Sequence, residues 1–563
     1  MIHHEWARST NGPTTEAKVT KATAAVWPAL GFLLGLVLLT LALSTSTARA
    51  KEFDSTDLEL FRYSLWLKSL GPGFDVAQGN VFLMTNDQCP TFVSVFKSCF
   101  GQNPAAPYIV PQPPVGNSYV DPYYATPFNT PGPHNQNTNI FYRLSDQEAL
   151  VTIVSYPPKA AYLGYVSYAF TRESSEYVGI TPPRPPTVSP DSNRYELFGS
   201  IGNGVNNVTV KNQLGFSPWN RAVVVYVTTS NTNLAAAIIK SARKHFIDPK
   251  SIFVEPIGSN MHTGNDSSAD DMVTLMRYAI PKSTNAADDW TSSLSRNVLV
   301  YKVSNTTLAV KRYGEISYTP HIVNNPETAS LQTAEQQLAS LLQGYLTQKQ
   351  FPLQSEIQPF VVPTTVTAEG VPNGGLVGSV CIYYGVNCLG DSQDTNTYNF
   401  TNLRTIDPQE TAFVVGVNHA VPQLNNARYV SVGVFNAANE SGVASASQTN
   451  PQAIGFDSGS LDGSAKGILK ALGIAIPPAY TALKANLSNL YAVAVARNIN
   501  NSTIAPAAQY AIDLKGTSLI PLNTPIQIQG RAYICPGTTA GGNVAFMLNP
   551  LIVVARKDLP PSE

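Results

Sequence analysis

The sequence predicts a β-rich α+β protein, made of two modules of similar pattern that a helix joins. Three observations predict this class. Short runs of Val, Ile, Tyr and Phe recur along the chain, which is typical of strands and hairpins. Helical spacing is confined to a few segments. The order of strand-like segments in the first half recurs in the second half, which indicates an internal repeat.

Residues 1–50 are expected to be a targeting segment. An apolar run from Ala29 to Leu43 follows two lysines and ends in the small-residue sequence Ala48-Arg49-Ala50. This order is typical of a secretory signal peptide, so we expect cleavage before Lys51. Counted from Ala24, the run approaches the roughly 20 residues of a membrane-spanning helix, so a retained signal anchor is the alternative. Both predict a chain that is secreted or at the cell surface.

Residues 51–135 are expected to hold a helix and then an irregular segment. Ser55 or Thr56 can cap the helix, and a Gly-Pro-Gly sequence ends it. From Asn103 to Pro133 the chain is rich in Pro, Asn and Tyr without a sustained period, which is typical of a loop or linker.

Residues 136–325 are expected to form the first β-rich module. Residues 149–155 and 161–170 flank a turn with two prolines, which predicts a hairpin. Strand-like residues 222–228 and 251–255 enclose a helical pattern, which predicts a βαβ unit.

The end of this module is expected to differ in pattern. Asp270 or Asp271 can cap a helix that runs to Ile280 and stops at a proline. A last strand is predicted at 297–303.

Residues 326–365 are expected to be a helix and linker, and residues 366–563 the second β-rich module. A leucine stripe predicts the helix over 331–346. Segments 413–417, 427–435, 456–463 and 490–496 repeat the order of 150–154, 161–170, 198–204 and 222–228. The alternative is that short Val/Tyr strands resemble one another in any protein.

Composition limits the functional classes. Only 13% of residues are charged and the formal net charge is −1, without a cluster of Lys and Arg in sequence. Nucleic-acid binding needs several cations facing phosphates, so we do not expect it.

Cysteines and Asn-x-Ser/Thr sequences agree with an extracellular compartment. Cys89 and Cys99 are ten residues apart and Cys381 and Cys388 are seven apart, which predicts two local disulfides and leaves Cys535 single. Neither spacing suits a metal. Acceptors for N-glycans are expected, although such triplets also arise by chance in an Asn-rich chain. They are Asn207, Asn265, Asn305, Asn399, Asn439, Asn486, Asn500 and Asn501.

Signatures of common catalytic mechanisms are absent from the sequence. It contains no H-E-x-x-H, G-x-S-x-G, phosphate-binding loop or dinucleotide fingerprint. The remaining candidate is His419, which follows Asn418 at the end of a predicted strand. With Asp457 or Asp462 it could act as a general base that a carboxylate orients. The alternative is that Asn418 and His419 satisfy backbone groups in a loop.

Two further binding hypotheses follow from local patterns. Tyr162 and Tyr168 share one strand face, so they would stack on sugar rings if exposed and form core if buried. The acidic stretches 265–271 and 457–462 resemble calcium loops in composition, but neither has the EF-hand spacing, and helix capping is the alternative. We predict no other metal site and no cofactor.

Taken together, the sequence predicts a secreted or cell-surface glycoprotein with a non-catalytic binding or structural role, directed toward carbohydrate or matrix. The alternative is a secreted hydrolase or lyase that uses His419 with a nearby carboxylate.

Overall fold

A computed structural model describes the following residues: 55–96, 98–99, 103, 106–115, 128, 130–133, 137–173, 193–220, 222–322, 326–349, 356–359, 382, 390, 392–399, 405–408, 410–439, 441–443, 456–499, 504–514, 520–543 and 546–556. The chain divides into two compact units, Met1–Leu58 and Glu59–Glu563. Of the first unit only the start of helix α2 (Ser55–Lys68) is described, so the predicted leader lies outside the described residues. The elements below belong to the second unit.

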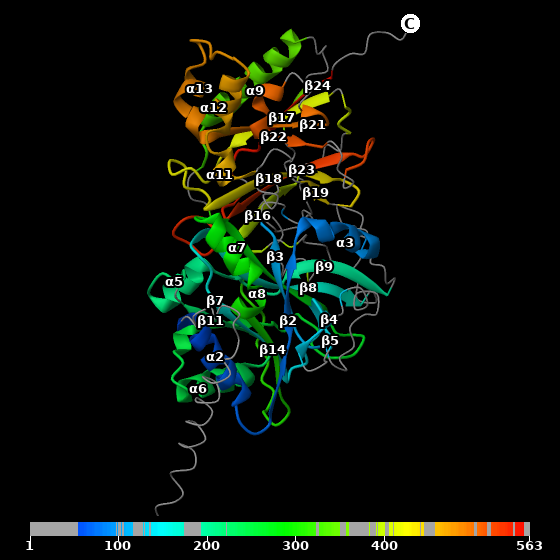
Figure 1. The fold of residues 1–563 in the computed structure, drawn as a ribbon, viewed down its shortest axis with the longest axis vertical. Coiled ribbons are helices and arrows are strands. Elements are labelled where there is room, and N and C mark those ends of the chain that lie inside the picture. The colour runs from blue at the N-terminus through cyan, green and yellow to red at the C-terminus, as the bar shows by residue number, and fades with distance from the viewer. Residues whose placement is uncertain are drawn as a thin grey trace, which may run out of the picture. The chain divides into compact units, whose positions relative to one another are not determined.

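The first module contains two sheets (Figure 1). The five-stranded sheet has the order β1 (Phe74–Gln78), β14 (Val298–Asn305), β7 (Glu148–Ser155), β11 (Val223–Thr229) and β12 (Ile252–Pro256). Strand β7 is antiparallel to both neighbours. Strands β11 and β12 are parallel and joined through α6 (Thr232–Lys244), which confirms the predicted βαβ unit.

The second sheet of this module is seven-stranded. Its strands are β10 (Val205–Asn206), β8 (Ala160–Glu173), β13 (Asp271–Pro281), β3 (Tyr108–Gln112) and β2 (Asn80–Met84), with β6 (Phe141–Tyr142) beside β13 and β9 (Arg194–Ser200) beside β8. Strand β3 lies inside the segment expected to be irregular. The helix expected from Asp270 to Ile280 is wrong, because these residues form β13, the longest antiparallel partner of β8.

Alternation of side chains explains how the sheets of the first module pack. Leu150, Val154 and Val224 point toward the seven-stranded sheet, whereas Val151 and Val225 point to the other face. Helices α2 and α6 cover that other face. The remaining elements are α3 (Cys89–Phe96), α5 (Asn207–Leu214), α7 (Thr284–Ser292), α8 (Leu294–Asn297) and the β4–β5 pair (Thr130–Pro131, Asn137–Thr138).

Helix α9 (Ala329–Gln348) leads into the second module, and burial of Leu331, Leu338, Leu342 and Leu346 confirms its predicted stripe. One sheet has the order β15 (Glu356–Pro359), β24 (Leu551–Arg556), β17 (Glu410–Val417), β21 (Leu490–Ala496) and β22 (Ala511–Asp513). The other contains β16 (Thr395–Asn399), β23 (Ile526–Tyr533), β18 (Tyr429–Asn436), β19 (Gly442–Val443) and β20 (Phe456–Asp457). Helices α11 (Ser458–Leu461), α12 (Ser464–Ala471) and α13 (Thr481–Asn486) follow β20.

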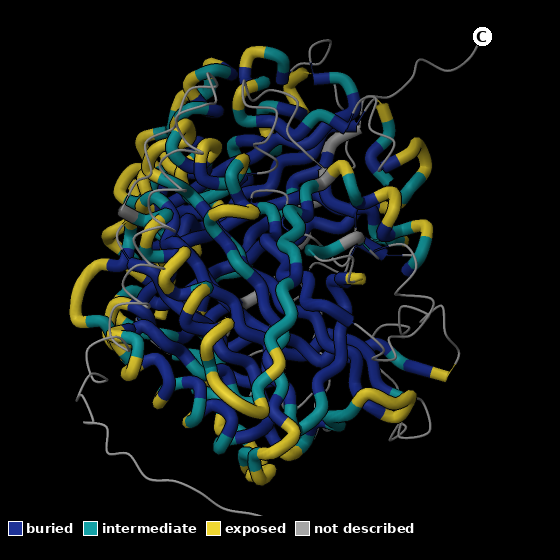
Figure 2. Tube along the Cα trace, turned by 60° about the horizontal axis from the view of Figure 1, so that its bottom comes forward, coloured by how far each residue is buried: buried dark blue, intermediate teal, exposed yellow. Residues whose placement is uncertain are grey.

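The two modules share one strand topology, which confirms the repeat predicted from sequence. One predicted correspondence is wrong, because Phe456–Asp457 is equivalent to Val205–Asn206 and not to part of 198–204. In the first, β7 lies between β14 and β11, and β11 is parallel to β12. In the second, β17 lies between β24 and β21, and β21 is parallel to β22. A short 3₁₀ helix (Ala505–Tyr510) stands between β21 and β22 where the first module has α6. In both modules the strands are buried along most of their length, and exposed residues gather in turns (Figure 2).

Strand register gives the residue correspondence between the modules. Gly164 of β8 pairs with Asn206 and with Arg277. Ser431 of β18 pairs with Asp457 and with Arg531. Tyr162 and Tyr429, each two residues earlier, therefore occupy equivalent positions.

Candidate functional site

His419 lies at the end of β17 and is paired with a carboxylate, as the enzyme hypothesis requires. The carboxylate is that of Glu327, whose Oε1 atom lies 2.5 Å from His419 Nδ1. Both side chains are almost fully buried, and Glu327 Oε2 accepts a hydrogen bond from Leu548 N at 2.6 Å. The pair links the start of α9 to the end of β17. No local pattern in the sequence indicates this pair, because the two residues are 92 positions apart.

The other predicted members of this site have local structural roles. Asp457 caps α11 by accepting hydrogen bonds from Gly459 N and Ser460 N. Burial raises the pKa of the Asp457 carboxyl. Asp462 follows the same short helix and is exposed. Asn418 accepts from Ala420 N and donates to Ser458 O, which is the backbone role that the alternative reading predicts.

Tyr162 and Tyr168 are core residues, 2% and 6% exposed. Tyr168 packs on Phe198, with ring centroids 5.1 Å apart. Tyr162 packs on Tyr533 at 5.0 Å and donates its hydroxyl to Asp394 Oδ2 at 3.0 Å. Neither ring offers a face to a sugar, so the core alternative for this pair is confirmed.

Tyr162 belongs to a polar aromatic cluster where the two modules meet. The Arg277 guanidinium stacks 4.3 Å from the Tyr108 ring centroid and 5.1 Å from that of Tyr533, and it also donates to both hydroxyls. Asp394 accepts from Tyr162 and from Asn206 Nδ2. Burial raises the pKa of the Asp394 carboxyl, although these donors oppose the shift.

Contacts across this junction are reciprocal. Before β3, Cys99 N donates to Asn439 O, and Asn103 Nδ2 donates to Tyr429 Oη at 2.7 Å. Before β16, Gly390 N donates to Phe198 O at 2.9 Å, and Asp394 accepts from Tyr162. Each module thus extends a segment onto the other module. Such exchange of equivalent contacts is the signature of an isologous interface between two copies.

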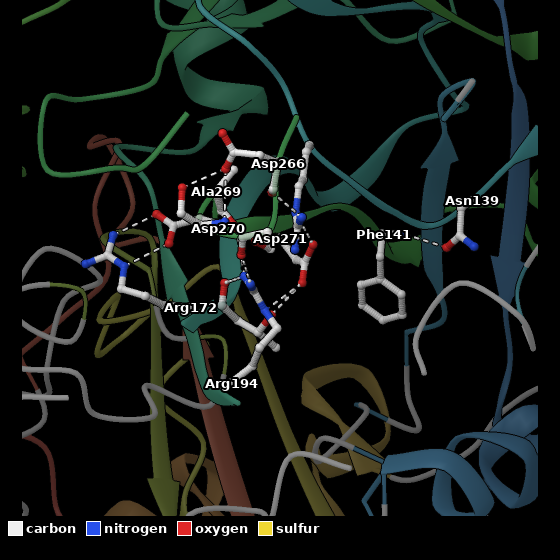
Figure 3. Close-up of polar contacts among 12 residues, drawn as sticks. Asn139, Phe141, Arg172, Arg194, Asp266, Ala269, Asp270 and Asp271 are labelled. Atoms are coloured by element: carbon white, nitrogen blue, oxygen red, sulfur yellow. Dashed lines mark hydrogen bonds and ion pairs between the residues drawn. The ribbon is translucent and has the colours of Figure 1, made fainter. Parts of the chain in front are cut away.

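The acidic stretch 265–271 is occupied by ion pairs with arginines (Figure 3). Arg172 holds Asp270 with two bonds of 2.7 and 2.8 Å, and Arg143 and Arg194 bind the two oxygens of Asp271 at 2.7 and 3.0 Å. Because guanidinium groups already neutralise both buried carboxylates, the ion pairs disfavour calcium binding by Asp270 and Asp271. Helix capping by these aspartates is wrong, since a strand follows. In the part of the chain that the structure describes, no group of three His, Cys, Asp or Glu residues could hold a metal.

The cysteines agree in part with the prediction. Cys89 and Cys99 form a disulfide, whereas Cys381 and Cys388 lie outside the described residues. Cys535 is unpaired and buried, and burial raises its thiol pKa to about 11.

The predicted glycan acceptors occupy different environments. Asn265 is exposed, and Asn439 and Asn486 are half-buried. Asn207 and Asn305 are buried, and their side-chain oxygens accept backbone hydrogen bonds, which disfavours a glycan in the folded chain. Asn399 ends strand β16, and Asn500 and Asn501 lie outside the described residues.

An apolar cavity of about 30 Å³ lies between α3 and the seven-stranded sheet. Its walls include Phe92, Phe141, Phe170 and Phe198. Cys99 of the disulfide lines it as well. Such a cavity offers no polar group to orient a reacting substrate.

No protein-family model and no curated protein matches the chain. Among solved structures, the crystal structure of the VPA0106 protein from Vibrio parahaemolyticus is similar over 74% of this chain and 87% of that one, with 8% sequence identity and a TM-score of 0.30. The fold itself defines the class: an α+β protein of two modules with the same arrangement of mostly antiparallel sheets. Among the described residues, no helix has the length and apolar character to span a membrane.

Proposed function

We propose that this chain is a secreted or cell-surface glycoprotein with a non-catalytic binding or structural role. The leader predicted from sequence supports the compartment. The Cys89–Cys99 disulfide is compatible with an oxidising environment, and the exposed Asn265 supports glycosylation.

One observation carries the non-catalytic role: the best acid–base candidate is buried in a structural pair. A general base must reach the proton of a bound substrate. His419 instead lies 2.5 Å from Glu327, in the packing between α9 and β17, and both side chains are at most 2% exposed. This position favours a role in holding the helix to the sheet.

Carbohydrate or a matrix component is the ligand class that we propose. The low charge and the abundance of Asn, Thr and Tyr in the sequence support it. Because Tyr162 and Tyr168 are core residues, recognition would rely on other side chains at the surface.

A glycan and matrix-protein array with the secreted chain tests the proposal, with product release measured in the same wells. We expect binding without product. Glu327→Gln should bind as the unchanged chain does, and exposed Glu315→Gln is its control. The comparison uses variants whose melting temperatures match that of the unchanged chain.

The alternative is a hydrolase or lyase, and the His419–Glu327 pair favours it because a carboxylate orients the base in known acid–base sites. Product release that falls in Glu327→Gln but not in Glu315→Gln would establish this enzyme and overturn the non-catalytic role.

A further inference from the structure

Helices α2 and α6 expose both large apolar and basic side chains on the surface that faces away from the sheet. Both helices pack their buried sides on the same face of the five-stranded sheet, through Leu60 and Trp66 of α2 and Leu234 and Ile238 of α6. Their other sides therefore point away from the sheet. The helices also touch at their ends, where Ser69 Oγ lies 3.0 Å from His245 Nε2.

Large apolar side chains stand on this outer surface. Phe61 is 59% exposed and Leu65 is 51% exposed, one helical turn apart on α2. Phe246, directly after α6, is 90% exposed and has a φ of 57°, in the left-handed region that a bulky residue rarely adopts. The backbone thus presents a phenylalanine to solvent at a strained position.

Basic side chains are exposed on the same two helices and on the turn after α6. From Glu59 to Lys68 and from Thr232 to Lys250 the exposed cations are Arg62, Lys68, Lys240, Arg243, Lys244 and Lys250. These two helices and the turn after α6 carry three acidic residues, Asp57, Glu59 and Asp248, and Glu59 already pairs with Arg62 at 3.5 Å. The folded chain therefore collects positive charge that is scattered in a sequence of net charge −1.

We propose that this α2–α6 surface docks on an anionic lipid membrane. Basic residues on the polar part of a helical surface, with Phe and Leu between them, are the pattern of helices that lie in a membrane interface. Lipid phosphates attract the cations, and the apolar side chains enter the boundary of the acyl chains.

The position of the surface in the chain selects a membrane over a protein partner. Eleven residues separate Leu43, the end of the predicted leader, from Ser55, the start of α2. Fully extended, they span at most about 40 Å. A retained leader would therefore hold α2 close to the bilayer. The inference does not depend on the ligand proposed above.

Co-sedimentation of the secreted chain from Lys51 with lipid vesicles tests the proposal. We expect binding to vesicles of phosphatidylglycerol and phosphatidylcholine that weakens as salt is raised, and little binding to phosphatidylcholine alone. The double variant F61S/L65S should bind roughly tenfold more weakly or worse. The triple variant K240Q/R243Q/K244Q should lose on the order of 100-fold.

Matched controls lie elsewhere on the molecule. Phe216 and Leu522 are 51% and 59% exposed, so F216S/L522S removes equal apolar exposure from other segments. Lys466 and Lys470 are exposed on α12, so K466Q/K470Q is the charge control. Both controls should bind as the unchanged chain does.

Three results would overturn the membrane assignment. The first is absence of binding to anionic vesicles by a folded chain, and the second is equal loss in the control variants. The third is a concentration-dependent dimer, seen by light scattering, that F61S/L65S abolishes, because it would give the surface to a second copy.

Discussion

At the scale of single residues, the buried carboxyl groups differ in whether they have a charged or hydrogen-bonding partner. Asp270 and Asp271 each meet at least one guanidinium in the network that also holds Arg143 and Arg194. Glu335 of α9 is different: it is 2% exposed, and its Oε1 atom has no hydrogen-bond partner among the described residues. Burial, and after it the charge of Glu327, raises the pKa of Glu335 well above 4.5.

Glu335 should make stability fall as pH rises. Above about pH 4.5 the unfolded chain releases this proton while the folded chain keeps it, so folding loses about 1.4 kcal/mol per pH unit until the folded pKa is passed. Glu335→Gln removes that loss, and its advantage over the unchanged chain should grow from pH 5 to pH 7. Urea unfolding at several pH values measures it. A difference in the free energy of unfolding that does not change with pH would contradict the raised pKa of Glu335. A change of the same size in exposed Glu315→Gln would contradict it as well.

Sequence reasoning reached only part of the candidate site at this scale. His419 was selected because it follows a strand, and the structure gives it a carboxylate partner. The partner Glu327 could not be found, since no periodicity links a residue before α9 to one after β17. The sequence offers Asp457 as the carboxylate for His419. In the structure Asp457 is instead the N-cap of α11, where its side chain accepts two backbone hydrogen bonds.

At the scale of elements, most strands with several adjacent Val, Ile or Tyr residues were predictable. Strands β7, β8, β11 and β17 follow this pattern. Strand β13 was not predictable, because Met, Leu and Ala in Asp271–Pro281 suit a helix as well as a strand. An acidic pair, which is typical of a helix start, precedes them. The place of β13 between β8 and β3 decides its conformation, because β8 pairs with it along almost its whole length.

The Cys89–Cys99 disulfide belongs to this scale, because it closes one short segment ahead of strand β3. Arg277 pairs with Tyr108, and its equivalent Arg531 pairs with Thr397. Cys99 and Cys388 each stand nine residues before these strand positions. The module repeat thus supports a second disulfide between Cys381 and Cys388.

Peptide mapping without reduction should find Cys89 linked to Cys99 and Cys381 linked to Cys388. Because Cys535 is buried, its thiol should react with a maleimide only after unfolding. A linked peptide that contains Cys535 would contradict this pairing. Removing the first bridge with C89S/C99S should lower the free energy of unfolding by about 2 to 3 kcal/mol.

At the scale of the whole molecule, the junction of the modules decides how the chain unfolds. Arg277 connects Tyr108 of the first module with Tyr533 of the second. A desolvated cation over an aromatic ring contributes about 2 kcal/mol. With the reciprocal contacts of Asn103 and Asp394, this coupling should make both modules unfold together.

The tryptophans allow a direct test, since Trp66, Trp219 and Trp290 all lie in the first half of the chain counted from Lys51. Their fluorescence reports that half, whereas far-ultraviolet circular dichroism reports both. The two denaturation curves should coincide in the unchanged chain and separate in Arg277→Met. Arg531→Met, at the equivalent position of the second module, serves as control. Separate curves in the unchanged chain, or the same separation in the control, would contradict the coupling.

The crossing segments before β3 and β16 have a consequence for how this molecule could be divided. Each module places one segment against the other module, as the subunits of a domain-swapped dimer do, but here within a single chain. Cleavage of the chain between the modules should therefore not separate the two fragments, since the contacts of both crossing segments would have to break first.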